Sequence, residues 1–235
     1  MSKQIITIGH RGAKGYEPEN TISSFEEAIR LGCDYVELDV HLGDEELFVI
    51  HDSSVDRTTN GSGKISELTR EEIESLDAGD GQKIPTLSEV LAFIDGRCGV
   101  NIELKGLGTG EPVNDLLSSL LHRSRPSSPI LVSSFDHREL AAINKKLRRG
   151  ILFDKIPDNW IELARKHSAW SVNLAYKTVS LDIIQKAHLQ GFRVLVYTVN
   201  NPIQMKKLVS LGVDGMFSDF PDRLLDAMPP GEKDD

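Results

Sequence analysis

The stretch Asp34-Tyr35-Val36-Glu37-Leu38-Asp39-Val40-His41-Leu42 alternates strictly from its tyrosine onward. The alternation predicts a strand with polar side chains on one face and aliphatic side chains on the other. Glu37 and Asp39 therefore point the same way and are close enough to share one cation. An ordinary half-buried strand with a wet acidic face has the same pattern, so the alternation alone leaves both interpretations open.

A second apolar run, Leu47-Phe48-Val49-Ile50, follows a turn at Gly43-Asp44-Glu45 and ends in His51-Asp52. If the two runs pair as a hairpin about that turn, His51 returns to lie beside Glu37. The hairpin thus predicts that a histidine and two carboxylates meet at one strand end.

Strand-like and helix-like segments alternate along the rest of the chain. We expect strands at 5–8, 34–42, 100–105, 130–134, 150–153, 170–174, 192–198 and 215–218, and helices between them, including 86–94, 113–121 and 136–147. Repeated βα units predict a closed (β/α)₈ TIM barrel. A doubly wound open sheet is the main competitor, but no glycine-rich dinucleotide fingerprint follows the first strand.

The polar segment at about 43–83, which carries His51, is expected to be a small insertion after the second strand. A connection this long within a compact domain is more often functional than idle. We expect residues 1–235 to form a single barrel domain and residues 229–235 to form a disordered tail.

The 235 residues carry a formal net charge of −9, which argues against nucleic acid or an anionic membrane as a partner. The two cysteines do not form a CxxC pair, so both are expected to be reduced. The N-terminal apolar run is too short for a signal-peptide core, and no stretch is as long as a membrane span. These features predict a cytoplasmic enzyme.

Residues suited to catalysis lie on or directly after the first three strands. They are His10 and Arg11, then Glu37 and Asp39, then Glu103 and Lys105. The active site of a TIM barrel lies at the C-terminal ends of its strands, so these side chains are expected to converge.

Several motifs extend this pattern in order along nearly the whole chain. They are His10-Arg11-Gly12-Ala13, Pro18-Glu19-Asn20-Thr21, Glu37-Leu38-Asp39-Val40, His51-Asp52, Asp56-Arg57-Thr58-Thr59-Asn60-Gly61, Ile102-Glu103-Leu104-Lys105, Ser133-Ser134-Phe135, Val196-Tyr197-Thr198-Val199-Asn200 and Gly212-Val213-Asp214-Gly215. With these motifs the sequence resembles the glycerophosphodiester phosphodiesterase family. The resemblance implies a metal-dependent barrel enzyme that hydrolyses glycerophosphodiesters, such as glycerophosphocholine or glycerophosphoethanolamine, to sn-glycerol 3-phosphate and an alcohol.

Glu37, Asp39 and Glu103 match the metal ligands of the family. Three carboxylates suit one divalent cation, Mg²⁺ or Ca²⁺. His10 and His51 match the acid–base pair, because imidazole titrates near neutral pH, although which histidine is the acid stays open. Attack on phosphorus by the glycerol 2-hydroxyl, through a cyclic phosphate, and attack by water also stay open.

Arg11 and Lys105 resemble the phosphate-binding residues of the family, and they would explain how an acidic protein holds an anion. Tyr197 stands where many relatives carry tryptophan, and its ring is expected to contact the glycerol carbons.

The expected partner is a small-molecule glycerophosphodiester, and the expected assembly is a monomer or homodimer. Two alternatives remain: another metal-dependent TIM-barrel enzyme of the isomerase type, and a non-catalytic phosphodiester-binding protein.

Overall fold

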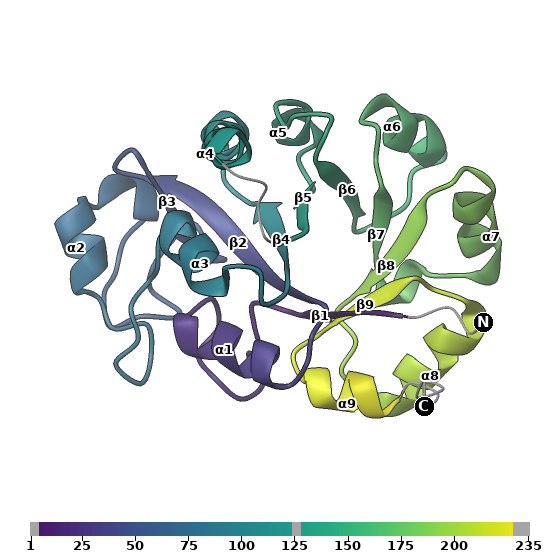
Figure 1. Ribbon diagram of the computed structural model, residues 1–235, viewed down its shortest axis with the longest axis horizontal. Helices are drawn as coiled ribbons and strands as arrows, with labels where there is room; N and C mark the ends of the chain where they lie inside the picture. Colours follow the sequence, from purple (N-terminus) through teal and green to yellow (C-terminus); the bar gives the residue numbers. More distant parts are fainter. Residues whose placement is uncertain (1–4, 124–127, 228–235) are drawn as a thin grey trace.

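The computed structural model describes residues 5–123 and 128–227. Within these ranges, nine strands form one sheet in the order β1-β9-β8-β7-β6-β5-β4-β2-β3. Because β1 also pairs in parallel with β2, eight of the strands close into a barrel, with helices around the outside (Figure 1). The predicted (β/α)₈ barrel is confirmed.

The strands are β1 (Ile6–Gly9), β2 (Tyr35–Gly43), β3 (Glu46–Val49), β4 (Gly99–Leu104), β5 (Ile130–Ser134), β6 (Arg148–Phe153), β7 (Ser171–Ala175), β8 (Arg193–Tyr197) and β9 (Gly215–Ser218). The helices are α1 (Ile22–Arg30), α2 (Arg70–Ser75), α3 (Leu87–Ile94), α4 (Gly110–Arg123), α5 (His137–Ala141), α6 (Trp160–Lys166), α7 (Leu181–Leu189), α8 (Pro202–Leu211) and α9 (Pro221–Asp226). Most helices therefore follow a barrel strand directly and return the chain to the start of the next strand.

The two faces of β2 lie in different environments, as the alternation predicts. Val36, Leu38 and Val40 are fully buried in the main core, which joins the outer face of the barrel to the helices. Tyr35, on the opposite face, packs in a separate apolar cluster with Phe217 and other residues of the barrel strands. Tyr35 precedes Glu37 by two residues on the same face of β2, so this cluster lies next to the carboxylates inside the barrel.

The β2–β3 hairpin forms, but its predicted register is wrong. Val40 pairs with Val49, and the N–H of Ile50 donates to the carbonyl of Asp39. Asp44 and Glu45 both have positive φ angles, 44° and 61°, as the central residues of a two-residue turn. The turn is therefore shorter than the expected Gly43-Asp44-Glu45, and His51 does not lie directly beside Glu37.

The helix expected over 136–147 is longer than the helix observed there. The observed helix, α5, ends at Ala141, and a turn follows in which the Asn144 side chain accepts a hydrogen bond from the N–H of Lys146. Asparagine offers the backbone this alternative to helical hydrogen bonds, which is why it favours turns.

The segment between β2 and α3 has a small core of its own, formed around Phe48, Val55, Ile65 and Ile73. It carries α2 and lies to one side of the barrel (Figure 1). The predicted tail at 229–235 lies outside the described residues. No helix in the described ranges combines the length and apolar character that crossing a membrane requires.

Candidate active site

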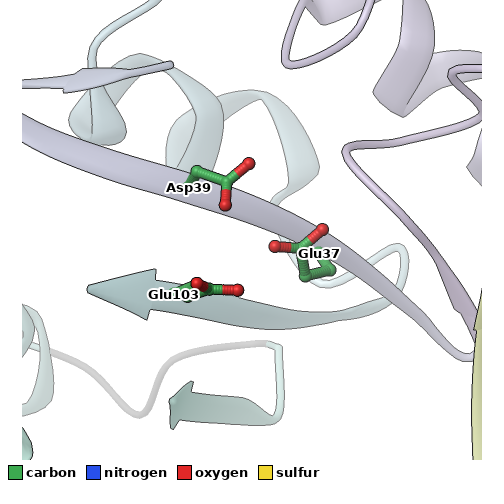
Figure 2. A group of neighbouring side chains, drawn as sticks. All are labelled: Glu37, Asp39 and Glu103. Carbon is green, nitrogen blue, oxygen red and sulfur yellow. The ribbon is translucent and has the colours of Figure 1, made fainter. Parts of the chain in front are cut away.

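Three carboxylates from two neighbouring strands meet at the barrel mouth. Glu37 and Asp39 lie on β2, and Glu103 on β4 is the register partner of Asp39 (Figure 2). One oxygen from each group lies within 4.8 Å of the others. The residues are only 2%, 1% and 9% exposed, so the three acids are gathered away from bulk water.

Burying three carboxylates side by side costs free energy unless a positive charge balances them. Burial, followed by the charges of Asp39 and Glu103, raises the pKa of Glu37 well above its ordinary range. Burial and then the charge of Asp39 raise the pKa of Glu103 to about 7. The Oε1 atom of Glu37 is buried and has no hydrogen-bond partner among the described residues. An all-oxygen donor set with an unpartnered oxygen fits a hard divalent cation.

Arg11 reaches these acids from the loop after β1. Its backbone N–H donates to Glu37 Oε2 at 2.8 Å, and its Nε lies 3.3 Å from Asp39 Oδ2. The backbone of Arg11 has a φ of 54°, and Gly12 follows with a φ of 80°. A side chain at Gly12 would strike Ser24, because a Cβ there would lie 2.4 Å from Ser24 Oγ. Glycine is therefore required for the turn that aims Arg11 at the acids.

Lys105 lies at the end of β4. Its Nζ is 3.0 Å from Glu103 Oε1 and 3.9 Å from Asp39 Oδ1. Together with Arg11 it brings two cations to the three acids, so the positions predicted to bind phosphate also balance the carboxylate charge.

His10 is held by a residue that directly follows the last barrel strand. Its Nδ1 lies 2.6 Å from Asp219 Oδ1, and Asn200 Nδ2 donates to Asp219 Oδ2 at 2.7 Å. Burial lowers the pKa of His10, although Asp219 acts in the opposite direction. The neutral imidazole is thereby favoured, with Nδ1 engaged and Nε2 available for another partner.

His51 has a similar arrangement in the segment after β3. Its Nδ1 lies 2.6 Å from Asp52 Oδ1, and its backbone carbonyl contacts His41 Nε2 at 3.0 Å. Burial lowers the pKa of His51, while the negative charge of Asp39 opposes this shift. His51 thus lies within the electrostatic reach of Asp39.

A cavity of about 30 Å³ lies among some of the predicted site residues. His10, Glu37, Glu103 and Tyr197 are among its lining residues. The Tyr197 hydroxyl donates to the carbonyl of Phe153 at 3.0 Å, and its ring meets that of Phe135 edge-on at 5.8 Å. Tyr197 therefore presents its ring to the cavity while its hydroxyl is engaged elsewhere.

Sequence reasoning missed several residues that hold the site together. Asp219 supports His10, and Asn20 donates from Nδ2 to Asp39 Oδ2 at 2.9 Å. The signal for Asp219 was its place directly after the last barrel strand. Asn20 lies within a motif already noted, but nothing in the sequence indicates that its side chain reaches Asp39.

Comparison with known proteins gives a consistent result. A sequence model described as the glycerophosphoryl diester phosphodiesterase family matches residues 10–223. The glycerophosphodiester phosphodiesterase of Caldanaerobacter subterraneus subsp. tengcongensis is 35% identical over 240 residues, covering 96% of this chain and 98% of that relative. The glycerophosphodiester phosphodiesterase of Bacillus altitudinis is 35% identical over 233 residues, covering 92% of this chain and 95% of that relative.

Solved structures agree. A phosphodiesterase from Oleispira antarctica, in complex with the product sn-glycerol-3-phosphate, has a TM-score of 0.88 and 31% identity and covers 94% of this chain and 95% of that chain. A glycerophosphodiester phosphodiesterase from Agrobacterium tumefaciens has a TM-score of 0.82 and 29% identity, and the match covers 94% of this chain and 99% of that chain. The resemblance drawn from the motifs is confirmed: the chain belongs to the glycerophosphoryl diester phosphodiesterase family, a family of phosphodiester hydrolases.

Proposed function

We propose that the protein hydrolyses glycerophosphodiesters of small alcohols, such as glycerophosphocholine or glycerophosphoethanolamine, to sn-glycerol 3-phosphate and the alcohol. In the net reaction water is added, the bond between phosphorus and the alcohol oxygen breaks, and the glycerol keeps its phosphate. The product bound to the Oleispira antarctica relative supports this choice of bond.

The observation that carries the proposal is the buried set of three carboxylates, whose oxygens lie within 4.8 Å of one another beside two cationic side chains. Glu37, Asp39 and Glu103 would hold one Mg²⁺ or Ca²⁺. A bound dication supplies positive charge that polarises a phosphoryl oxygen. Arg11 and Lys105 bind the remaining phosphate charge, Arg11 through its planar fork and Lys105 as a point charge.

His10 and His51 act as the acid–base pair. An aspartate engages Nδ1 of each ring at 2.6 Å, which orients the ring and leaves Nε2 for the substrate. One imidazole takes the proton of the attacking group, the glycerol 2-hydroxyl or a water, and the other donates a proton to the leaving alkoxide. The Tyr197 ring, with its hydroxyl already engaged, contacts the glycerol carbons.

An assay of both possible products tests the proposal. The chelator-treated protein is incubated with glycerophosphocholine or glycerophosphoethanolamine, with and without added Mg²⁺ or Ca²⁺. We expect metal-dependent release of sn-glycerol 3-phosphate together with choline or ethanolamine. Release of phosphocholine and glycerol instead, or no hydrolysis of either substrate with either metal, contradicts the proposal.

A further inference from the structure

Arg57 lies outside the barrel, in the segment that carries His51, yet it contacts the aspartate that orients this histidine. Its Nε donates to Asp52 Oδ2 at 2.6 Å, and its Nη2 donates to Asp52 Oδ1 at 3.1 Å. Asp52 Oδ1 is also the atom that lies 2.6 Å from His51 Nδ1. The guanidinium therefore fixes both oxygens of the carboxylate that holds the ring.

The same guanidinium reaches the barrel. Its Nη1 and Nη2 donate to Glu19 Oε2 and Oε1 at 3.0 and 2.8 Å. Glu19 Oε1 also accepts from Arg11 Nη1 at 2.7 Å. Glu19 is thus shared by Arg57 and by the arginine that we propose binds phosphate.

These contacts form one continuous path, from His51 through Asp52, Arg57 and Glu19 to Arg11. His51 and Arg57 belong to the segment between β2 and α3, whereas Glu19 and Arg11 belong to the loop between β1 and α1. The two segments carry different parts of the proposed chemistry, and Arg57 is a direct link between them.

We propose that Arg57 is a positioning residue that holds the His51–Asp52 pair and the Arg11 guanidinium in one geometry around the substrate phosphate. This inference rests on the proposed function and deepens it, because it assigns a role to a residue that need not touch the substrate. Each carboxylate receives two hydrogen bonds from the planar fork, a geometry that a lysine ammonium cannot reproduce.

The effect of Arg57 on the charge of Asp52 also supports this role. The Arg57 hydrogen bonds are the largest influence on Asp52 and lower its pKa, so Asp52 stays an anion facing His51. Arg57 is itself 48% exposed, so water screens part of its attraction to Glu19 and Asp52. We therefore expect removal of Arg57 to lower turnover under conditions where the variant remains folded, beyond any loss of stability.

Arg70 provides a matched control in the same segment. It is 50% exposed, and it pairs with Glu74 at 2.5 Å and with Glu46 at 3.5 Å. Neither partner belongs to the proposed site. Arg57→Ala and Arg70→Ala each remove a half-exposed arginine that pairs with two carboxylates, but only Arg57→Ala breaks the path to His51.

The test compares Arg57→Ala, Arg57→Lys and Arg70→Ala in the full-length protein. We expect Arg57→Ala to lower kcat about 10–100-fold with a smaller change in KM, the range seen when groups supporting a catalytic ligand are removed. Arg57→Lys should recover little of the loss, and Arg70→Ala should behave as wild type. An Arg57→Ala enzyme with the kcat of Arg70→Ala, or full recovery with lysine, overturns the proposal.

A second readout does not depend on turnover. Nitrogen NMR signals of the His51 ring should report one tautomer, with Nδ1 protonated, in wild type and in Arg70→Ala, and a mixture in Arg57→Ala. Unchanged His51 signals in Arg57→Ala contradict the proposal even if activity falls. If the wild-type protein hydrolyses no glycerophosphodiester, the proposed function fails, while the ring signals still decide whether Arg57 positions His51.

Discussion

At the scale of single residues, both histidines are oriented by the same kind of contact, between ring Nδ1 and an aspartate. His10 and His51 each place Nδ1 2.6 Å from an aspartate oxygen. Burial lowers the pKa of both rings, so each is neutral over much of the range near neutral pH. In the proposed reaction, the ring that serves as the base therefore begins in its neutral form.

Removing either ring tests the acid–base assignment. His10→Ala and His51→Ala are each expected to lower kcat about 10²–10⁴-fold, the usual contribution of a positioned acid or base. Affinity for Mg²⁺ or Ca²⁺, measured by calorimetry, should change little because the carboxylates remain. Near-wild-type turnover in both variants contradicts the assignment.

Glu19 gives a prediction that depends on pH. Burial alone would raise its pKa, but Arg57 and Arg11 outweigh burial and lower the pKa to about 2 from an ordinary 4.5. A carboxylate whose pKa is lowered in the folded state stabilises the protein above the ordinary pKa and loses that effect as the pH falls toward the lowered value.

Urea unfolding of wild type and Glu19→Gln measures this effect. We expect wild type to be more stable by on the order of 2 kcal/mol at about pH 6 and the difference to shrink at about pH 3. A difference that stays constant over this range means that Glu19 is not held as an ion by the two arginines.

The sequence predicted which side chains gather at the mouth, but not what holds them. Glu37, Asp39 and Glu103 follow from alternation and from the strand-end rule. Asp219 could not be paired with His10, because 209 positions separate them and only barrel closure brings β9 beside β1. The contacts of Arg57 likewise depend on how the segment after β3 packs, which no local pattern encodes.

At the scale of elements, the tight turn between β2 and β3 stores strain. Glu45 has a φ of 61°, a conformation that glycine adopts without steric cost. Glu45→Gly should raise the free energy of unfolding by about 0.5–1 kcal/mol and leave activity unchanged. Glu45→Ala is the control, since it keeps the strained backbone and should not stabilise. Equal effects of the two substitutions in urea unfolding contradict this explanation.

Local patterns predicted most elements well. The strand expected at 130–134 coincides with β5, and the helix expected at 86–94 matches α3 (Leu87–Ile94) to within one residue. The errors occurred where a short polar side chain or a backbone turn competes with regular structure. Asn144 follows the end of α5, and a two-residue turn rather than a longer one sets the β2–β3 register.

At the scale of the whole molecule, the barrel brings three acids together at a cost in folding energy. A cation that binds only the folded arrangement should offset that cost. Adding Mg²⁺ or Ca²⁺ at about 100 times its dissociation constant should stabilise the chelator-treated, metal-free protein by about 2.7 kcal/mol. For a chain of this size, that corresponds to a rise in Tm of roughly 5–11 °C.

The control for this shift is Glu103→Gln, which removes one ligand charge and keeps the side-chain volume. Its Tm should respond only weakly to either metal in differential scanning calorimetry. An unresponsive wild type, or an equal response in Glu103→Gln, means that the stabilising cation does not bind at the three carboxylates.

The central claim is that Glu37, Asp39 and Glu103 hold one hard dication beside the two histidines. A crystal structure of the protein with Ca²⁺ tests it most directly. We predict one calcium ion bound by oxygens of all three residues at about 2.3–2.6 Å, with His10 and His51 close enough to contact a phosphate on that ion. A calcium ion bound elsewhere, or a site where the three carboxylates turn away from one another, would contradict the account.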